Sequence, residues 1–220
     1  VKKEGSAYDL TIAAGFLAAS GQMPDEKLDK YFIMGELSLD GKIKPVKGML
    51  PIAIQALKDG FKGMLVAKEN AREASIVKDL KVYGVDSLDE IVDFFKGSRT
   101  FEPTFLDTRS EFEEDQRKWG KDFSDVKGQK NIKRAMEIAA AGGHNIILIG
   151  PPGAGKTMLA KRLPSILPPL NLYEALETTK IHSVAGKLDP ETALMAQRPF
   201  RNPHHTISDV ALVGGGNNPQ

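Results

Sequence analysis

The sequence contains no cysteine. Without cysteine there is neither a disulfide framework nor a thiolate zinc site, which is typical of proteins in a reducing compartment. The sequence also lacks any apolar run approaching the roughly 18 residues of a membrane-spanning helix, and no secretory signal opens it. We therefore expect a cytoplasmic protein that does not enter a membrane.

The sequence also has no marked excess of positive or negative charge. Lysine and arginine number 30 and aspartate and glutamate 29, which leaves a formal net charge of +1. Bulk charge therefore gives no argument for nucleic-acid binding, although a local basic stripe is compatible with a balanced total. The 220 residues, 41% of them apolar, provide enough core for one large or two modest domains. An initiator methionine is absent and residues 214–220 read as a loop, so we expect a fragment of a longer protein.

One stretch matches a phosphate-binding loop at every required position. It follows the pattern G-x-x-x-x-G-K-[ST] and consists of Gly150, Pro151, Pro152, Gly153, Ala154, Gly155, Lys156 and Thr157. Glycines let such a loop curl until consecutive backbone N–H groups point into one concavity that binds an anion. We expect Lys156 to reach the β- and γ-phosphates of a nucleoside triphosphate and the Thr157 hydroxyl to ligate Mg²⁺.

The sequence on both sides of this loop supports the interpretation. The apolar run 144–149 predicts a buried parallel strand that enters the loop. Residues 158–163 have helical composition, which would place the phosphates at a helix N-terminus. A surface turn rich in glycine and proline can match the pattern by chance, but strand and helix flanks are not expected of it. We predict that the chain binds ATP together with Mg²⁺.

Helix and strand signals alternate through the first 98 residues and predict a compact α/β domain. Two helices are expected to begin at Asn70 and Ser87, because a carboxylate follows each of them three positions later, at Glu73 and Glu90. Asp40-Gly41 predicts a hairpin turn. The other expected elements are helices over 8–19 and 49–57 and strands over 31–34, 37–39, 63–67 and 80–85.

Between residues 99 and 118 the periodicity fades and charge rises, which we interpret as a solvated linker. A second domain is then expected over 119–220. Apolar residues on one side of 131–141 predict a helix that ends at the glycine pair 142–143, and a further helix is expected over 172–179.

Two stretches of this second domain resemble a known class of ATPase. Residues 121–129, of sequence KDFSDVKGQ, are similar to the element that packs around the adenine base in AAA+ ATPases. Residues 198–206, RPFRNPHHT, followed by ALVGGG at 211–216, resemble the signature of the magnesium-chelatase-type AAA+ branch. The resemblance implies the first part of a P-loop AAA+ αβα domain.

The same resemblance places the acidic Walker B strand, the sensor residues and the arginine finger beyond residue 220. In phosphoryl transfer these groups hold Mg²⁺, position the attacking water and stabilise charge in the transition state. We therefore expect residues 1–220 alone to bind nucleotide weakly and to hydrolyse it hardly at all.

The histidine pair His204-His205 suggests a metal site, but two adjacent histidines of a regular strand cannot both point at one ion, and no third ligand lies nearby in sequence. In the resembling branch this stretch belongs to an insertion near the pore-facing side of a ring. A role in substrate contact or subunit packing is therefore favoured. Arg198 and Arg201 are candidates for phosphate contacts or for solvated surface positions.

The first domain resembles a protease whose catalytic residues are absent. Residues 3–12 are similar to the region around the nucleophile of Lon-type Ser–Lys proteases, and residues 35–48 to the strand pair before the general-base lysine. This implies that residues 1–98 are the C-terminal part of a Lon-protease-like α/β domain of the ribosomal protein S5 domain 2 type. The alignment puts Ala7 at the nucleophile position and Leu50 at the lysine position.

A Ser–Lys dyad needs both groups within hydrogen-bond reach, and neither alanine nor leucine can act as nucleophile or base. Ser6 lies one residue from the nucleophile position and Lys47 three residues from the lysine position, offsets that point a side chain elsewhere. We therefore predict a non-proteolytic domain and no catalytic residue within the chain.

A Lon-like domain without its dyad, followed by a chelatase-type AAA+ domain, resembles the bacterial YifB/ComM family. This resemblance implies a ring-forming, hexameric ATPase that acts on single-stranded or branched DNA. The implied activity is branch migration or helicase activity during recombination of transforming DNA.

The alternative is the ATPase subunit of a metal-inserting chelatase, which remodels a protein partner. We expect such subunits to resemble this chain only after residue 119. Ala7 and Leu50 oppose a third interpretation, an ATP-dependent protease. A nucleotide-binding module without motor activity stays open.

Overall fold

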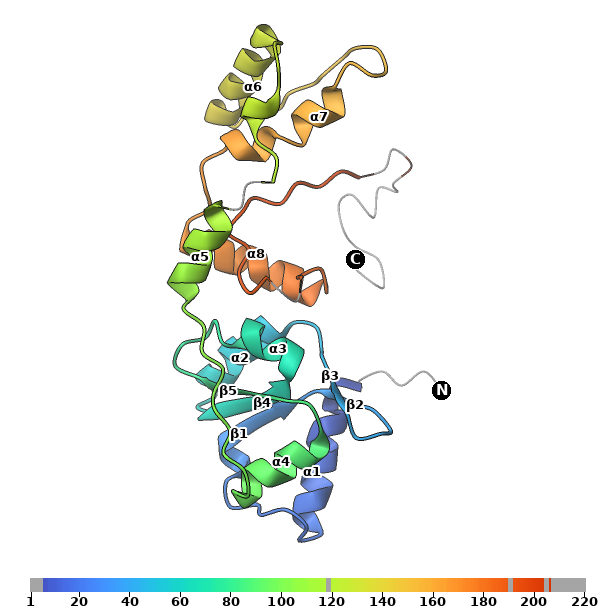
Figure 1. Ribbon diagram of the computed structural model, residues 1–220, viewed down its shortest axis with the longest axis vertical. Coiled ribbons are helices and arrows are strands. Elements are labelled where there is room, and N and C mark those ends of the chain that lie inside the picture. Colours follow the sequence, from blue (N-terminus) through green and yellow to red (C-terminus); the bar gives the residue numbers. More distant parts are fainter. Residues whose placement is uncertain (1–5, 118–119, 190–191, 204–205, 207–220) are drawn as a thin grey trace. The chain divides into compact units, whose positions relative to one another are not determined.

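The computed structural model describes residues 6–117, 120–189, 192–203 and 206, which form a mixed α/β structure (Figure 1). These residues divide into two compact units. Unit 1 comprises the chain up to Glu111 together with Leu176–Leu194, and unit 2 comprises Phe112–Ala175 with the chain from Met195 onward. The α/β class expected from the alternating signals is confirmed.

Unit 1 is built on a parallel sheet of three strands in the order β1-β4-β5. Residue Tyr31 of the first strand pairs with Gly63 of the central one, and Gly63 pairs with Lys81. Two short antiparallel strands join at the turn that Asp40-Gly41 predicts, where Gly41 has a φ of +81°. The strands are β1 (Tyr31–Met34), β2 (Glu36–Leu37), β3 (Ile43–Lys44), β4 (Gly63–Ala67) and β5 (Lys81–Val85).

Helices cover both faces of this sheet, so that unit 1 has three layers (Figure 1). On one face lie α1 (Asp9–Ala19) and α4 (Leu88–Lys96); on the other lie α2 (Met49–Lys58) and α3 (Lys68–Ala74). Short 3-10 turns, η1 (Ser6–Tyr8) and η2 (Leu28–Lys30), precede α1 and β1. The expected helices over 8–19 and 49–57 and strands over 31–34, 63–67 and 80–85 are confirmed within a residue or two.

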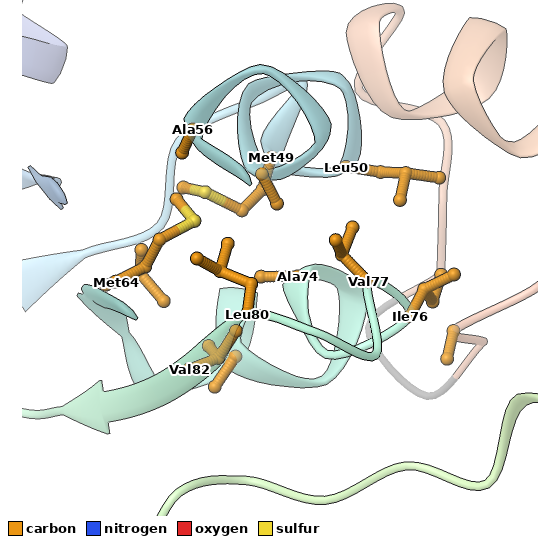
Figure 2. Packing of buried hydrophobic residues seen from close by; sticks show 13 residues of the cluster. Met49, Leu50, Ala56, Met64, Ala74, Ile76, Val77, Leu80 and Val82 are labelled. Atoms are coloured by element: carbon orange, nitrogen blue, oxygen red, sulfur yellow. The ribbon is translucent and has the colours of Figure 1, made fainter. Parts of the chain in front are cut away.

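The central strand β4 is buried along its whole length, because its alternating side chains fill both cores. Met64 and Val66 face α2 and α3, whereas Leu65 and Ala67 face α1 and α4. Figure 2 shows the first of these cores, where Met49 and Leu50 of α2 lie among residues of α3 and β5.

The expected capping of α3 by Asn70 is wrong. The helix begins at Lys68, and its N-cap residue, Ala67, makes no side-chain bond. Asn70 is only 6% exposed and bonds to a loop instead: its Oδ1 accepts the Val46 N–H at 2.8 Å and its Nδ2 donates to the Val46 carbonyl at 3.0 Å. The amide side chain therefore pairs with backbone in the way a neighbouring strand would.

The expected start of α4 is confirmed, since Ser87 is its N-cap residue. The capping bonds differ from the expectation, however. The Ser87 side chain makes no cap hydrogen bond, and Glu90 accepts the N–H of Asp86 at 2.8 Å. The carboxylate thus satisfies a donor one residue before the cap.

Unit 2 has a small core of four buried residues around the phosphate-loop helix. Its elements are η3 (Phe123–Asp125), α6 (Lys130–Gly142), α7 (Lys156–Ala160) and η4 (Leu163–Ile166). Helix α6 ends at Gly142, and its C-cap residue Gly143 has a φ of +62°, as the glycine pair predicted. This core cluster consists of Phe123, Val126, Met136 and Leu159. None of the helices in the described ranges is long and apolar enough to cross a membrane.

Two helices lie where the chain passes between the units. The stretch that we interpreted as a solvated linker contains α5 (Thr108–Arg117), within which the division between the units falls. The expected helix after residue 172 is α8 (Leu172–Val184), which continues beyond 179. Residues 176–194 group with unit 1, and Ala193 is buried in its core, whereas the sequence suggested that they belong to the second domain.

The prediction of a buried strand over residues 144–149 is wrong. These residues form no strand, and Ile147 and Ile149 are 81% and 88% exposed. The physical reason is the lack of a partner: the described residues of unit 2 contain no strand with which this run could exchange hydrogen bonds. An apolar run alone does not make a strand.

Candidate nucleotide-binding site

The phosphate-type loop is curled by two glycines. Gly153 has a φ of +80° and Gly155 a φ of +82°, in the left-handed region that L residues rarely adopt. No atom lies within 4 Å of where a Cβ on Gly153 would stand, so backbone conformation, and not space, calls for glycine there. Helix α7 begins directly after the loop, at Lys156.

The loop presents backbone donors without acceptors. Within the described part of unit 2, the N–H groups of Gly153, Gly155, Lys156 and Thr157 donate no hydrogen bond. Successive free N–H groups at a curled loop form the type of nest that accepts phosphate oxygens. The residues present therefore fit a polyphosphate.

The Lys156 ammonium points back over this loop. It donates to the Gly150 carbonyl at 2.8 Å and to the Pro151 carbonyl at 2.7 Å. Phosphate oxygens bound at the nest would compete for the same ammonium, since a charged acceptor forms the stronger bond. Thr157 is exposed, so its hydroxyl is accessible to a hydrated cation.

Lys156 and Thr157 line a cavity of about 380 Å³. No carboxylate is among the described residues that line it. These residues therefore supply groups that can bind phosphate but no acidic ligand for Mg²⁺. Its other lining residues are Met136, Ile146, Leu148, Ala160, Leu163, Phe200 and Asn202.

The stretch that resembles the adenine-binding element lies beside the loop. Phe123 packs in the same core as Leu159 of α7, and its N–H donates to the Ser165 hydroxyl at 3.0 Å. Gln129 has a φ of +50°, unusual for a residue other than glycine, and its Nε2 lies 3.9 Å from the Cβ position of Gly155. The fold thus brings both ends of residues 121–129 to the phosphate-type loop and its helix.

A capping box fixes the start of this element. The Asp122 carboxylate accepts the Ser124 N–H at 2.7 Å, and Asp125 accepts the Asp122 N–H at 3.2 Å. Hydrogen bonds from the Ser124 side chain and then from its backbone lower the pKa of Asp122 below its ordinary value. The carboxylate is therefore ionised at neutral pH.

Arg162 is a residue that the sequence interpretation missed. Its Nε donates to the Asp122 carbonyl at 3.1 Å, and its guanidinium pairs with Asp125 at 3.3 Å. The arginine follows α7 by two residues, so it ties the end of the phosphate-loop helix to η3. Nothing in a single sequence marks this arginine among its neighbours.

The chelatase-type signature is only partly within the described residues. Arg198 donates from Nε to the Pro168 carbonyl at 2.7 Å, and Phe200 lines the cavity that holds Lys156. Arg201 is exposed. The pair His204-His205 and residues 211–216 lie outside the described residues. Among the residues that are described, no three His, Asp or Glu gather as a metal site would require.

Ala7 and Leu50, which the resemblance to Lon aligns with the Ser–Lys dyad, make structural contacts in unit 1. Leu50 is 0% exposed and belongs to the core of Figure 2, while its N–H donates to Glu73 at 2.8 Å. Ala7 lies in η1, where its carbonyl accepts the Gly35 N–H at 3.2 Å. Of the two nearby alternatives, Ser6 donates to Glu36 at 3.4 Å, and the stem of Lys47 lies over Gly186.

Known protein families match this chain along most of its length. A model described as magnesium chelatase, subunit ChlI, matches residues 122–220, and one described as subunit ChlI of Mg-chelatase matches residues 1–70. The protein YifB of Escherichia coli K12 is 44% identical over 215 residues, or 97% of the chain. Competence protein ComM of Haemophilus influenzae is 43% identical over 222 residues, or 99% of the chain. The chain belongs to the YifB/ComM family.

The chain spans about two-fifths of the length of these YifB/ComM relatives, 41% of YifB and 42% of ComM. The expectation that chelatase subunits match only after residue 119 is wrong, because a model described as a ChlI subunit also matches residues 1–70. A Lon protease of Halothermothrix orenii is 29% identical over 100 residues, 43% of the chain and 12% of that protease. The similarity to Lon is therefore weak and partial.

Proposed function

We propose that this chain is the nucleotide-binding part of an AAA+ ATPase that acts on DNA. The observation that carries the proposal is the curled loop of residues 150–157, whose N–H groups at 153 and 155–157 donate to no acceptor in the described part of the chain, with the ammonium of Lys156 above them. Lys156 would hold the β- and γ-phosphates of ATP, and Thr157 would ligate Mg²⁺. Residues 121–129 would enclose the adenine.

The motor would work as a ring, in the simplest case a hexamer in the bacterial cytoplasm. ATP held between neighbouring subunits would favour one arrangement of the loops that line a central channel, and hydrolysis would release it. Such a change requires that the nucleotide bind two arrangements with different affinity. The DNA task best supported is branch migration or helicase activity on single-stranded or branched DNA, since one relative is a competence protein.

Unit 1 would serve this motor as a Lon-like domain without proteolysis. Leu50 is part of the hydrophobic core, and Ala7 offers a methyl group where a nucleophile would stand. A scaffold, a subunit contact or a nucleic-acid surface are the roles that such a domain retains.

A second candidate function is chelatase-like remodelling of a protein partner during metal insertion. The observation that favours it is that both matching family models are described as chelatase subunits. The two functions differ in what stimulates hydrolysis, DNA for the motor and a protein partner for the chelatase.

The test uses the full-length protein. ATP hydrolysis is measured without DNA, with single-stranded DNA and with branched DNA, in the wild type and in Lys156→Ala. The motor predicts hydrolysis that DNA raises and that Lys156→Ala abolishes. DNA binding is measured at low salt, where phosphate contacts are strongest. If DNA neither binds there nor raises the rate, the motor hypothesis is wrong.

A further inference from the structure

A second pocket of unit 2, of about 270 Å³, is lined by three cationic side chains. Lys121 lies in the segment before η3, and Lys161 directly follows α7. Arg198 lies in the segment after residue 195. The phosphate-type loop does not line it, so the pocket is separate from the candidate nucleotide site.

Within the described residues, no ion pair compensates the charge of this pocket. No carboxylate lines it, and within the described residues none of Lys121, Lys161 and Arg198 forms an ion pair. Other arginines of unit 2 do have such partners, as Arg162 pairs with Asp125 and Arg134 with Glu137. Three like charges that converge without a counter-ion create a positive potential that attracts an anion.

The segments that carry these cations are held in place by hydrogen bonds. The Ser165 hydroxyl accepts the Phe123 N–H at 3.0 Å and donates to the Arg162 carbonyl at 2.8 Å, which joins η3 to η4 at the pocket. Arg198 is anchored through its Nε on the Pro168 carbonyl. The fold therefore places the guanidinium of Arg198 and the backbone segments that carry Lys121 and Lys161.

An aromatic ring completes the pocket. Phe200 is 39% exposed and lines both this pocket and the cavity that contains Lys156 and Thr157. Cations that follow a phosphate backbone beside a ring on which a base can stack are typical of sites that bind single strands without sequence preference.

We propose that this pocket binds a single strand of nucleic acid, with phosphodiester groups against Lys121, Lys161 and Arg198 and a base stacked on Phe200. This inference rests on the proposed DNA function and gives it a site. Because Phe200 also borders the cavity of the phosphate-type loop, the bound strand would lie next to the ATP phosphates.

The test measures binding of a fluorescent oligothymidine to the full-length protein across a range of salt concentrations. The variant Lys121→Gln/Lys161→Gln/Arg198→Gln should bind more weakly and lower the slope of log affinity against log salt by about 2, since each single-strand phosphate contact contributes roughly 0.7. Phe200→Ala should weaken binding about tenfold. It should have no such effect with an abasic oligomer, which has no base to stack.

A matched control removes three exposed lysines of unit 1 in the variant Lys58→Gln/Lys62→Gln/Lys78→Gln and should leave the slope unchanged. The conservative variant Lys161→Arg should keep wild-type binding, and the far-ultraviolet circular dichroism of every variant reports that it is folded.

If the wild type binds DNA and the triple pocket variant binds it equally well, the pocket proposal fails and the DNA function stands. A wild type that binds no DNA overturns both. Loss of ATP affinity or of inorganic phosphate binding in the pocket variant, with unchanged DNA binding, would assign the pocket to free phosphates and overturn the proposal.

Discussion

Two polar side chains of α3 connect it to the segment before α2, to α2 itself and to α8. Asn70 holds both backbone groups of Val46, and Glu73 accepts the N–H of Leu50 and the hydroxyl of Ser183. These bonds fix the segment where a Lon-type protease would carry its lysine. In unit 1, the polar side chains of Asn70 and Glu73 at this position therefore stabilise the fold.

The variant Asn70→Ala should lower the free energy of unfolding of unit 1 by about 2–3 kcal/mol, because it leaves the N–H and the carbonyl of Val46 without partners. Urea denaturation measures the change. Glu69→Ala, an exposed neighbour on the same helix, is the control and should change stability little. Equal stability of the two variants would contradict the role of Asn70.

Tyr83 makes the stability of unit 1 sensitive to alkaline pH. Burial, and then the neighbouring Tyr31, raise the pKa of the Tyr83 phenol above its ordinary value. The folded state therefore favours the neutral phenol. This contribution is fully present below the unfolded pKa of about 10 and is lost as pH rises through the higher folded pKa.

Tyr83→Phe should consequently lose less stability than the wild type between pH 8 and about pH 11, as measured by urea denaturation at both values. Tyr8→Phe changes a tyrosine that is exposed and should behave as the wild type does. The prediction is wrong if both variants follow the wild-type curve.

The roles of Asn70 and Glu73 could not be predicted from sequence, because the same three-residue spacing is that of a capping box. Their real partners, Val46, Leu50 and Ser183, lie 23 to 110 positions away in sequence. The glycines of the phosphate-type loop were predictable, since their backbone conformation is a local property.

At the scale of elements, strands form where neighbouring strands exist. Residues 63–67 and 144–149 are both short apolar runs, yet only the first has partners on each side, in β1 and β5. The local pattern predicts an apolar segment, and the surrounding chain decides whether it becomes a strand. The hairpin at Asp40-Gly41 was predictable for the opposite reason, because its signal is contained in the turn itself.

The close approach of β4 to its neighbours depends on Gly63. A Cβ at this position would stand 2.6 Å from the Lys81 carbonyl and 3.0 Å from the Tyr31 ring. Gly63→Ala should therefore destabilise unit 1 by about 1–3 kcal/mol in a denaturation experiment. Gly15→Ala, on α1 with nothing within 4 Å, is the control and should be neutral or stabilising. The reverse order would refute this description of the sheet.

Arg162 links the end of α7 to η3, and this link leads to a second prediction at the scale of elements. Arg162→Ala removes the bonds to Asp122 and Asp125, which frees the adenine-type element to move relative to the phosphate-type loop. We expect ATP affinity to fall several-fold, which is on the order of 1 kcal/mol. Arg134→Ala breaks an exposed ion pair on α6 and should leave ATP affinity unchanged. Unchanged affinity in Arg162→Ala, measured by nucleotide titration of the full-length protein, would contradict the link.

At the scale of the whole molecule, we propose that the chain carries one part of an ATPase site. Among the described residues, no carboxylate lines the cavity around Lys156 and Thr157, and the chain spans about two-fifths of its YifB/ComM relatives. We propose that the acidic groups for hydrolysis come from the remaining length. The phosphate-type loop was predictable from sequence, whereas the basic pocket was not, because its three cations come from separate segments.

The most direct test of this account is the steady-state rate of ATP hydrolysis by the full-length protein with and without single-stranded DNA. We predict a rate that DNA raises in the wild type and that falls to background in Lys156→Ala under both conditions. A rate that is indifferent to DNA, or one that survives Lys156→Ala, would contradict the assignment of a DNA-dependent ATPase to this loop.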